Sequence, residues 1–419
     1  MYRVQKNHLR RVPKPTYRLL RQMCRTAKDL YNTTLWTVRQ HWEANNTYLP
    51  YEQAYHLVKE TACYQQLPSQ VAQQTMKVVD RTFKAFFGLL RRKQQGTYNR
   101  PAHLPRYLPK EGFFVCIFQK NLLKLEGKQL RVSLGHYMTK TYGVRYLWFV
   151  VPPTVQGHVI KELRIIPRCR GQYFELEWVY DLPPQALPET ARGYLAIDLG
   201  LANFATCVAT TGPAFIIEGR GLKAFNQWWN KEKARVQAIY DRQGIQMGVQ
   251  LAWLLRKRSQ FLRNYMAQAV SYLVKYCLKH QLRTLVIGEL KGIKQHLNLG
   301  RQSNQHFHYI PYSLFKAKLR TKCEAFGIQY VEVPEAYTSQ TCSRCAQRRP
   351  ANRVHRGWYV CHQCGLRLNA DINGALNILQ HVAPDSAQQL GSSGRVNRPV
   401  RIRVIPIRGL PKLCLFRAE

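Results

Sequence analysis

Hydrophobic positions follow two different patterns in the first half of the chain, and each pattern predicts its own kind of structure. From Pro15 to about Leu90, apolar residues recur at helical spacing, which predicts a small helical domain. From Gly112 to about Leu182, short runs rich in β-branched and aromatic residues are separated by Gly, Pro and Asn, which predicts the strands of a small barrel or sandwich. These predicted strands are Phe113 to Gln119, Gln129 to Ser133, Val144 to Val151, His158 to Ile166 and Tyr173 to Tyr180.

The extended, basic segment at residues 1–12 predicts a further strand, which we expect to pair within the same β domain. The helical segment, residues 13–98, is then an insertion that splits this domain, and residues 99–182 supply the remaining strands. Prolines crowd residues 183–190, so we expect a stiff linker and a domain boundary there.

After the linker, residues 191–337 predict an α/β pattern. Three short strands are followed by a long charged helical stretch from about Lys223 to His280, then by a strand, a helix and a strand. A last helix is predicted within residues 368–382. This is the element order of an RNase H-like fold, so the fold class is predicted to be α/β and multidomain. The predicted strands are 194–197, 203–211, 214–218, 284–287 and 329–333, and the predicted helices after the long stretch are 312–326 and 370–379.

Positive charge dominates the composition: 64 Lys and Arg stand against 23 Asp and Glu, for a formal net charge of +41. The cations run along most of the chain, which favours a nucleic-acid partner over a membrane surface. The last segment, residues 383–419, is basic and contains Pro and Gly. From Gly391 to Glu419 its composition predicts an irregular segment that becomes ordered only on a partner.

No run of residues approaches the ~20 apolar positions of a membrane span, and the first residues lack the apolar core of a signal peptide. Most of the 12 cysteines are scattered singly, as is usual in a reducing compartment. We therefore expect a cytoplasmic protein without a membrane partner.

Two Cys-x2-Cys pairs provide the most specific chemical signal. Fifteen residues separate the first pair from the second, which is a spacing typical of structural zinc. Four unrelated thiols would not need this spacing, although sites built from four thiolates also accept other soft metals. We predict a zinc ribbon over residues 338–367, with the ligands Cys342, Cys345, Cys361 and Cys364.

Three carboxylates stand at the ends of predicted elements: Asp198 and Glu289 end apolar strands, and Asp371 opens the last helix. Converging carboxylates hold two divalent cations that hydrolyse phosphodiesters. Each residue also has a purely structural interpretation. Asp198 could cap a turn, Glu289 could face water at a strand end, and Asp371 could cap its helix.

Cations and aromatic residues also alternate inside the long helical stretch, a pattern that suits a groove for a nucleic-acid backbone with stacking positions. The alternative is a solvated helix face with Phe261 and Leu262 in the core. The candidate contact residues are Arg256, Lys257, Arg258, Phe261 and Arg263.

The order of these motifs resembles the TnpB family of transposon-encoded, RNA-guided DNA nucleases, relatives of the compact type V CRISPR effectors. The resemblance covers about residues 190 to 381. The matching segments are Ala196 to Gly200, Val286 to Leu290, Thr338 to Cys345 with Cys361 to Cys364, and Asp371 to Ile378.

The resemblance implies a RuvC-type nuclease site in which Asp198, Glu289 and Asp371 are catalytic and bind two Mg²⁺ ions, with Mn²⁺ able to replace them. The family often has an Asp where this chain has Asn369. In the first half of the chain only the architecture matches, namely a wedge-like β-barrel split by a helical recognition domain.

The implied partners are a guide RNA from the end of the element, double-stranded target DNA and a companion transposase, in the prokaryotic cytoplasm or nucleoid. The short DNA motif beside the target would be met near Tyr51 and Gln73. Three alternatives stay open at this point: a regulator that occupies DNA without cleavage, an actin-like ATPase, and a transposase that joins strands.

Overall fold

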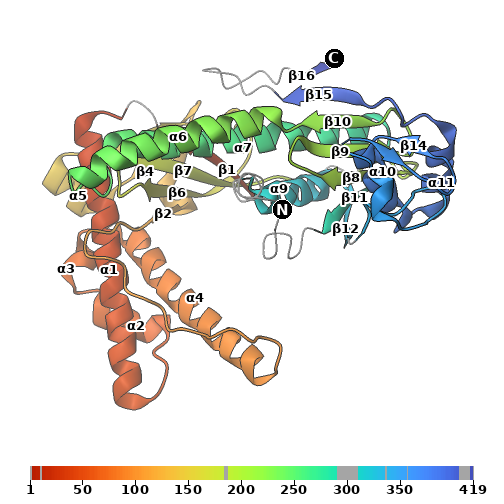
Figure 1. Cartoon of the computed structure of the whole chain (residues 1–419). Coiled ribbons are helices and arrows are strands. Elements are labelled where there is room, and N and C mark those ends of the chain that lie inside the picture. The colour runs from red at the N-terminus through yellow and green to blue at the C-terminus, as the bar shows by residue number, and fades with distance from the viewer. Residues whose placement is uncertain are drawn as a thin grey trace. The chain divides into compact units, whose positions relative to one another are not determined.

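The structure is a computed structural model that describes residues 2–9, 12–183, 187–289, 310–335, 337–355, 357–404 and 416–418. The chain divides into two compact units, Met1–Leu182 and Pro183–Glu419 (Figure 1). The division falls at the predicted linker, whose residues 184–186 lie outside the described ranges.

The first unit contains the predicted helical segment as four helices: α1 (Lys14–Asn45), α2 (Tyr51–Val58), α3 (Ala62–Gln65) and α4 (Ser69–Gln94). One face of α1 is buried together with the apolar face of α4, where Phe83 is almost fully covered. Burial of such faces supplies most of the stability of a helix in a protein. Helices are therefore present in the segment where the sequence predicted them.

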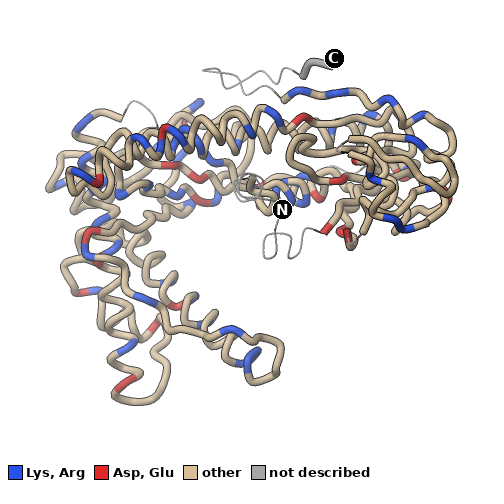
Figure 2. Tube along the Cα trace, viewed as in Figure 1, with Lys and Arg blue, Asp and Glu red and all other residues tan. Residues whose placement is uncertain are grey.

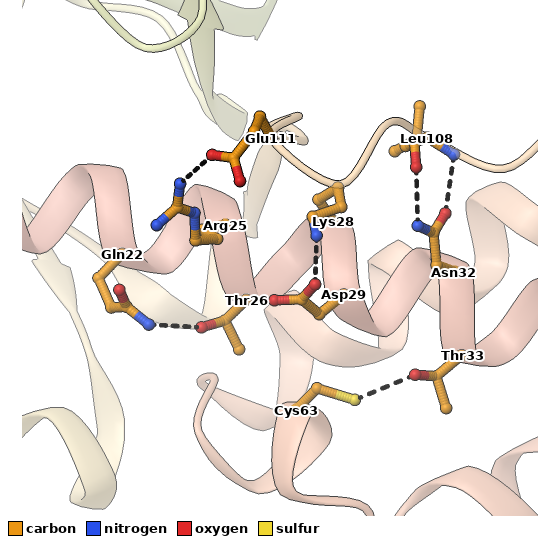
Figure 3. Close-up of polar contacts among 10 residues, drawn as sticks. All are labelled: Gln22, Arg25, Thr26, Lys28, Asp29, Asn32, Thr33, Cys63, Leu108 and Glu111. Atoms are coloured by element: carbon orange, nitrogen blue, oxygen red, sulfur yellow. Dashed lines mark hydrogen bonds and ion pairs between the residues drawn. The ribbon is translucent and has the colours of Figure 1, made fainter.

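The irregular segment that follows α4 is fixed to α1 by side-chain hydrogen bonds (Figure 3). Asn32 donates from Nδ2 to the carbonyl of Leu108 at 2.9 Å, and its Oδ1 accepts from the Leu108 amide at 2.8 Å. Nearby, Arg25 pairs with Glu111 at 2.9 Å. These contacts position the chain where it leaves the helices for the sheet.

The described strands of the first unit form two sheets, where the sequence predicted a small barrel or sandwich. One sheet has the order β1-β7-β6-β2 and the other the order β3-β4-β5. The strand at the start of the chain pairs antiparallel with β7, with Tyr2 opposite Asp181, so the helices α1–α4 lie in sequence between two strands of one sheet. The strands are β1 (Tyr2–His8), β2 (Cys116–Gln119), β3 (Leu123–Glu126), β4 (Gln129–Ser133), β5 (Tyr146–Val150), β6 (Ile160–Arg168) and β7 (Tyr173–Asp181), and α5 (Gly135–Tyr142) lies between β4 and β5.

The second unit is built on one sheet with the order β12-β11-β8-β9-β10-β15-β16. The three strands at its β12 edge are parallel, and β9 is antiparallel to β8 and to β10. The strands are β8 (Tyr194–Leu199), β9 (Asn203–Ala209), β10 (Phe215–Glu218), β11 (Thr284–Glu289), β12 (Gln329–Pro334), β15 (Val400–Val404) and β16 (Phe416–Ala418).

Helices cover both faces of this sheet. Residues of α7 and α9 share one core cluster with alternate sheet residues, and residues of α10 and α11 share the other. The strands of this unit, and the helices after the long helical stretch, lie in the order that the sequence predicted. The helices are α6 (Arg220–Arg242), α7 (Val249–Lys279), α9 (Tyr312–Ala325), α10 (Ala370–Gln380) and α11 (Pro384–Ser393), and the ribbon contributes β13 (Tyr359–Val360) and β14 (Arg367–Leu368).

The predicted single helical stretch from Lys223 to His280 is instead two helices. The chain turns between α6 and α7, where Gly244 has a positive φ of 65°. The two helices run antiparallel, because Phe225 near the start of α6 stacks on Phe261, while Tyr240 near its end reaches Gln250. The spacing of apolar residues in the sequence did not reveal this turn.

The prediction of an irregular tail from Gly391 is wrong at residues 391–393, which end α11, and at residues 400–404, which form β15. Strand β15 joins the main sheet parallel to β10. Apolar Val400, Ile402 and Val404 alternate with arginines, and Ile402 and Val404 are buried. This period-two pattern specifies a strand, and the basic composition concealed it. Residues 405–415 lie outside the described ranges.

Lys and Arg are distributed over both units (Figure 2). The positive charge of the described residues is therefore not confined to one unit. Among the described residues, no helix combines the length and the apolarity needed to cross a membrane.

We predict that Ile402→Ala lowers the free energy of unfolding of the second unit by about 2–5 kcal/mol, because it removes a buried side chain from β15. Arg398→Ala, at an exposed position in the same segment, should change it by less than about 0.5 kcal/mol. Chemical denaturation followed by circular dichroism measures both values. Equal and small effects would show that β15 does not belong to the core.

Candidate active site

Asp198 lies on β8, which pairs with β11 on one side and with β9 on the other. Along β8, Leu195 and Ile197 pack in the cluster of α7 and α9, whereas Ala196 packs in the cluster of α10. Because side chains alternate along a strand, Asp198 belongs to the α10 face. It is a carboxylate at the end of an apolar strand, as the sequence predicted.

Asp371 approaches this position from α10. The cap of the helix is Asn369, whose Oδ1 accepts from the amides of Asp371 at 2.9 Å and Ile372 at 3.4 Å. Asp371 therefore does not serve as the N-cap, and the capping interpretation of this residue is wrong. Its carboxylate instead accepts from Asn203 Nδ2 at 2.7 Å and lies 3.5 Å from the Arg353 guanidinium.

A glycine permits the close approach of α10 to β8. A Cβ at Gly374 would lie 2.6 Å from Oδ2 of Asp198, a distance that real Cβ atoms do not adopt. The helix backbone therefore lies directly on the Asp198 carboxylate. Since Asp371 is on the same helix, the two acids converge.

A third acid, Glu335, joins them, and the sequence analysis did not identify it. It follows the last residue of β12, which neighbours β11. A Cβ at Gly288 of β11 would lie 2.8 Å from Cδ and 2.9 Å from Oε2 of Glu335. The sequence does contain a pattern that could have identified Glu335. It is an acid directly after one strand, combined with a glycine in the strand that pairs with it.

The neighbouring acids affect the pKa of Asp198. Burial raises the pKa of Asp198 well above its usual range; the charge of Glu335, a hydrogen bond with it and the charge of Asp371 raise it further, and Arg353 opposes the shift. Burial also raises the pKa of Glu335, against a hydrogen bond from Asp198 and the charge of Lys316. Crowded carboxylates of this kind need a proton or a cation.

The residues present fit a divalent metal ion. Oxygen donors are what Mg²⁺ and Mn²⁺ prefer, and Oε2 of Glu335 is buried without a hydrogen-bond partner among the described residues. A buried oxygen without a partner is costly. A cation among these carboxylates would remove that cost.

Glu289, the third predicted acid, lies on the other face of the sheet from Asp198. It is the last residue of β11 and pairs with Pro334 of β12. Leu285 and Ile287 pack in the cluster of α7 and α9, so alternation places Glu289 on that face, opposite Asp198. The structure thus brings Asp198 and Asp371 together, whereas the side-chain alternation along β11 directs Glu289 to the other face of the sheet. Leu290, which follows it in the motif, lies outside the described residues.

The four cysteines of the predicted ribbon do converge. Their sulfur atoms lie within 4.8 Å of one another, and the pairs Cys342 with Cys364 and Cys345 with Cys361 are each 3.6 Å apart. A tetrahedral ion with Zn–S distances near 2.3 Å requires sulfur separations of roughly 3.8 Å. The four thiols can therefore hold one zinc ion.

The two Cys pairs have the same backbone geometry. The residue after each pair has a positive φ, 57° at Ala346 and 69° at Gly365. Its amide donates to the carbonyl of the first cysteine, at 3.0 Å in the first loop and 2.9 Å in the second. Burial alone would raise the pKa of Cys361, but amides of Cys364 and Gln363 outweigh it and lower the pKa to about 7. A thiol with this pKa is readily deprotonated to bind metal.

The ribbon is attached to the helix that carries Asp371. Asn377 of α10 donates to the carbonyls of Thr338 and Thr341, at 2.6 and 2.7 Å. Asn373 donates to Thr341 at 2.7 Å and accepts from the Ser343 amide at 3.0 Å. The first metal-binding loop and the acidic site are therefore mechanically connected through α10.

The predicted nucleic-acid residues on α7 fall into two groups. Phe261 stacks on Phe225 with ring centroids 3.7 Å apart, and the Arg258 guanidinium lies over Trp229, so these two contribute to the packing of α6 against α7. Lys257 instead lies between the exposed rings of Trp228 and Trp253, 4.2 and 4.5 Å from their centroids. Arg256 and Arg263 are partly exposed on the same helix.

Tyr51 and Gln73 belong to one half-buried cluster in the first unit. Tyr51 begins α2, and the Lys77 ammonium lies 4.9 Å from the centroid of its ring. Gln73 on α4 hydrogen-bonds with Tyr64, whose ring contacts Tyr55. The structure therefore places both predicted residues close to the interface of α2, α3 and α4.

Comparison with known proteins gives two family matches in the second half of the chain. Residues 177–294 match the family described as "Probable transposase" (OrfB_IS605), and residues 312–378 match "Cas12f1-like, TNB domain". The second match includes all four cysteines and Asp371.

Curated relatives extend over most of the chain. The "Putative RNA-guided DNA endonuclease InsQ" of Escherichia coli (strain K12) is 24% identical, over 91% of this chain and 92% of its own length. The "CRISPR-associated endodeoxyribonuclease Cas12f1" of Sulfoacidibacillus thermotolerans is 25% identical, over 78% of this chain and 79% of its own length. Among solved structures, the "mini-RNA-guided endonuclease CRISPR-Cas_phi3" has 10% identity and a TM-score of 0.47, and covers 92% of this chain and 93% of that chain.

The matched proteins are described as a probable transposase, an RNA-guided DNA endonuclease and a CRISPR-associated endodeoxyribonuclease. These similarities agree with the resemblance of the motifs to the TnpB family.

We predict opposite effects for two substitutions in the ribbon. Gly365→Ala places a side chain at φ 69° with no steric neighbour, so backbone strain of about 1 kcal/mol should weaken zinc retention. Ala346→Gly relieves the same strain in the other loop and should strengthen retention by a similar amount. Zinc release to a chromogenic chelator measures both. A change in the same direction for both variants would contradict the prediction.

Proposed function

We propose that the protein is an RNA-guided DNA endonuclease of a transposable element, which binds a guide RNA from the end of the element and hydrolyses target DNA beside a short motif. The observation that carries this proposal is the convergence of Asp198 and Asp371 at the end of β8 in a chain of charge +41. A protein that only occupied DNA would have no use for acids that repel one another.

The acids would hold two Mg²⁺ ions, or Mn²⁺ in their place, which activate water and stabilise the leaving oxygen of a phosphodiester. Asp198 would hold metal from the rigid sheet. Asp371 would do so from α10, where Asn203 and Arg353 orient its carboxylate. Glu289 stays a prediction that no contact described above supports.

The nucleic-acid partners follow from the charge and from the relatives. InsQ is named an RNA-guided DNA endonuclease and Cas12f1 an endodeoxyribonuclease, so we propose guide RNA and double-stranded DNA as partners here. The split β domain would then act as the wedge and the helices α1–α4 as the recognition domain, with Tyr51 and Gln73 near the target-adjacent motif. A companion transposase is a further proposed partner.

The first experiment is to express the gene with its native flanking DNA and to sequence the RNA that copurifies with the protein. A single discrete RNA that maps to the adjacent element end supports the proposal and supplies the guide for a cleavage assay. Heterogeneous cellular RNA, or none, would favour an unguided nuclease, a transposase or a DNA-binding regulator.

We predict that Asp198→Asn abolishes guided DNA cleavage and changes RNA affinity by less than about twofold, because the side chain serves the metal site. The same substitution removes charge repulsion, so the thermal stability of the metal-free protein should be at least that of the wild type. Gel-based cleavage, filter binding and calorimetry measure the three quantities. Cleavage by the variant at the wild-type rate would contradict the site assignment.

We also predict that Trp253→Ala weakens RNA binding about tenfold, since base stacking on an exposed aromatic ring is worth about 1–3 kcal/mol. Lys275→Ala, which removes an exposed charge from the same helix, is the control and should have an effect of less than about threefold. Equal losses in the two variants would indicate an electrostatic contribution alone.

A further inference from the structure

The chain carries an acid whose placement depends on the absence of a side chain in the neighbouring strand. β12 and β11 are parallel, with Val333 opposite Gly288. Val331 and Val333 pack in the cluster of α10, and Glu335 is two residues further on. By alternation it falls on the face that also carries Asp198.

Gly288 provides the space through which Glu335 reaches Asp198. The pairing of Ile197 with Ile287 makes Gly288 the next neighbour of Asp198 across the sheet. An added Cβ at position 288 would lie 2.8 Å from Glu335 Cδ and 3.1 Å from its Cγ. The carboxyl group therefore occupies the volume that any other residue in β11 would fill with its own side chain.

The Glu335 carboxylate has an unmet need for a partner. Its Oε2 is buried and accepts no hydrogen bond among the described residues. The positive charge of Lys316 acts on the Glu335 carboxylate. The Lys316 ammonium is, however, already paired with Glu332 at 2.8 Å. The other group in contact is Asp198, which is itself an acid. A buried carboxylate oxygen with these neighbours suits a metal ion as its missing partner.

Glu289 does not have this geometry. It follows Ile287 on the strand face that α7 and α9 cover, and it has interactions of its own. Its backbone lies opposite Pro334 rather than beside Asp198. A single strand cannot present both residue 288 and residue 289 to the same face without a bulge, and the β11 register with β12 is continuous through Glu289.

We propose that Glu335, and not Glu289, is the third carboxylate that binds divalent metal together with Asp198 and Asp371. The third ligand thus comes from the residue that directly follows β12. Gly288 of β11, which has no side chain, leaves room for it. This inference rests on the proposed nuclease function for its biological meaning, but metal binding can be measured without cleavage.

The test compares Glu335→Gln and Glu289→Gln in the purified full-length protein, with Mn²⁺ titrated by calorimetry and by electron paramagnetic resonance. Glu335→Gln should weaken Mn²⁺ binding at least tenfold, and Asp198→Asn should have the same effect. Glu289→Gln should leave it within about twofold of the wild type. Glu324→Gln, an exposed acid on α9, is the control for loss of charge. Weakening by Glu289→Gln with wild-type affinity in Glu335→Gln would overturn the proposal.

A second variant keeps the test valid if Glu335→Gln fails to fold. Gly288→Ala retains every acid but fills the volume of the Glu335 carboxyl, so it should also weaken Mn²⁺ binding about tenfold. Wild-type affinity in this variant would overturn the proposal. If the wild-type protein binds Mn²⁺ through Glu335 yet cuts no guided DNA, the proposed function fails while this inference stands.

Discussion

The mutual repulsion of crowded, partly buried carboxylates is the constraint around which the second unit is arranged. Asp198 is carried by a strand in the interior of the sheet, and its pKa is raised by burial, by Glu335 and by Asp371. Such a cluster is unfavourable in isolation, so the elements that supply it must be stabilised by other contacts. The paired strands β8, β11 and β12 and the buried face of α10 provide these contacts. Electrostatic repulsion between the acids thus destabilises the site, and the packing of the surrounding strands and of α10 stabilises it.

The zinc ribbon contributes to the same balance. Its first loop is bound to α10 through Asn373 and Asn377, and its Arg353 reaches the carboxylate of Asp371. A zinc ion held by the four thiols would make the loops rigid, because a bound structural zinc contributes its binding free energy to folding. A rigid ribbon in turn fixes the first turn of α10. The ribbon therefore supports the geometry of the acidic site as well as adding basic surface.

The sequence was sufficient for most of this architecture, and its failures have physical causes. Strand and helix order followed from periodicity, and the Cys-x2-Cys spacing specified the ribbon because four thiols at such intervals have little other use. Period alone did not reveal the turn between α6 and α7. Composition misled at β15, since Arg401 and Arg403 are in ion pairs with buried Glu218 while their apolar neighbours enter the core. Charged residues on one face of a strand do not make it irregular.

The acidic site shows which structural information a short sequence motif does not contain. A short motif identifies an acid near a strand end, but it does not say to which face of the strand that acid points. In β11 the difference between residues 288 and 289 reverses the face, and only the pairing with β8 and β12 determines which one meets Asp198. The glycine then becomes informative, because it marks the position where a side chain from the next strand enters. Glu335 lies far from Asp198 in sequence and close to it in the sheet, so the site is a property of strand pairing rather than of any one segment.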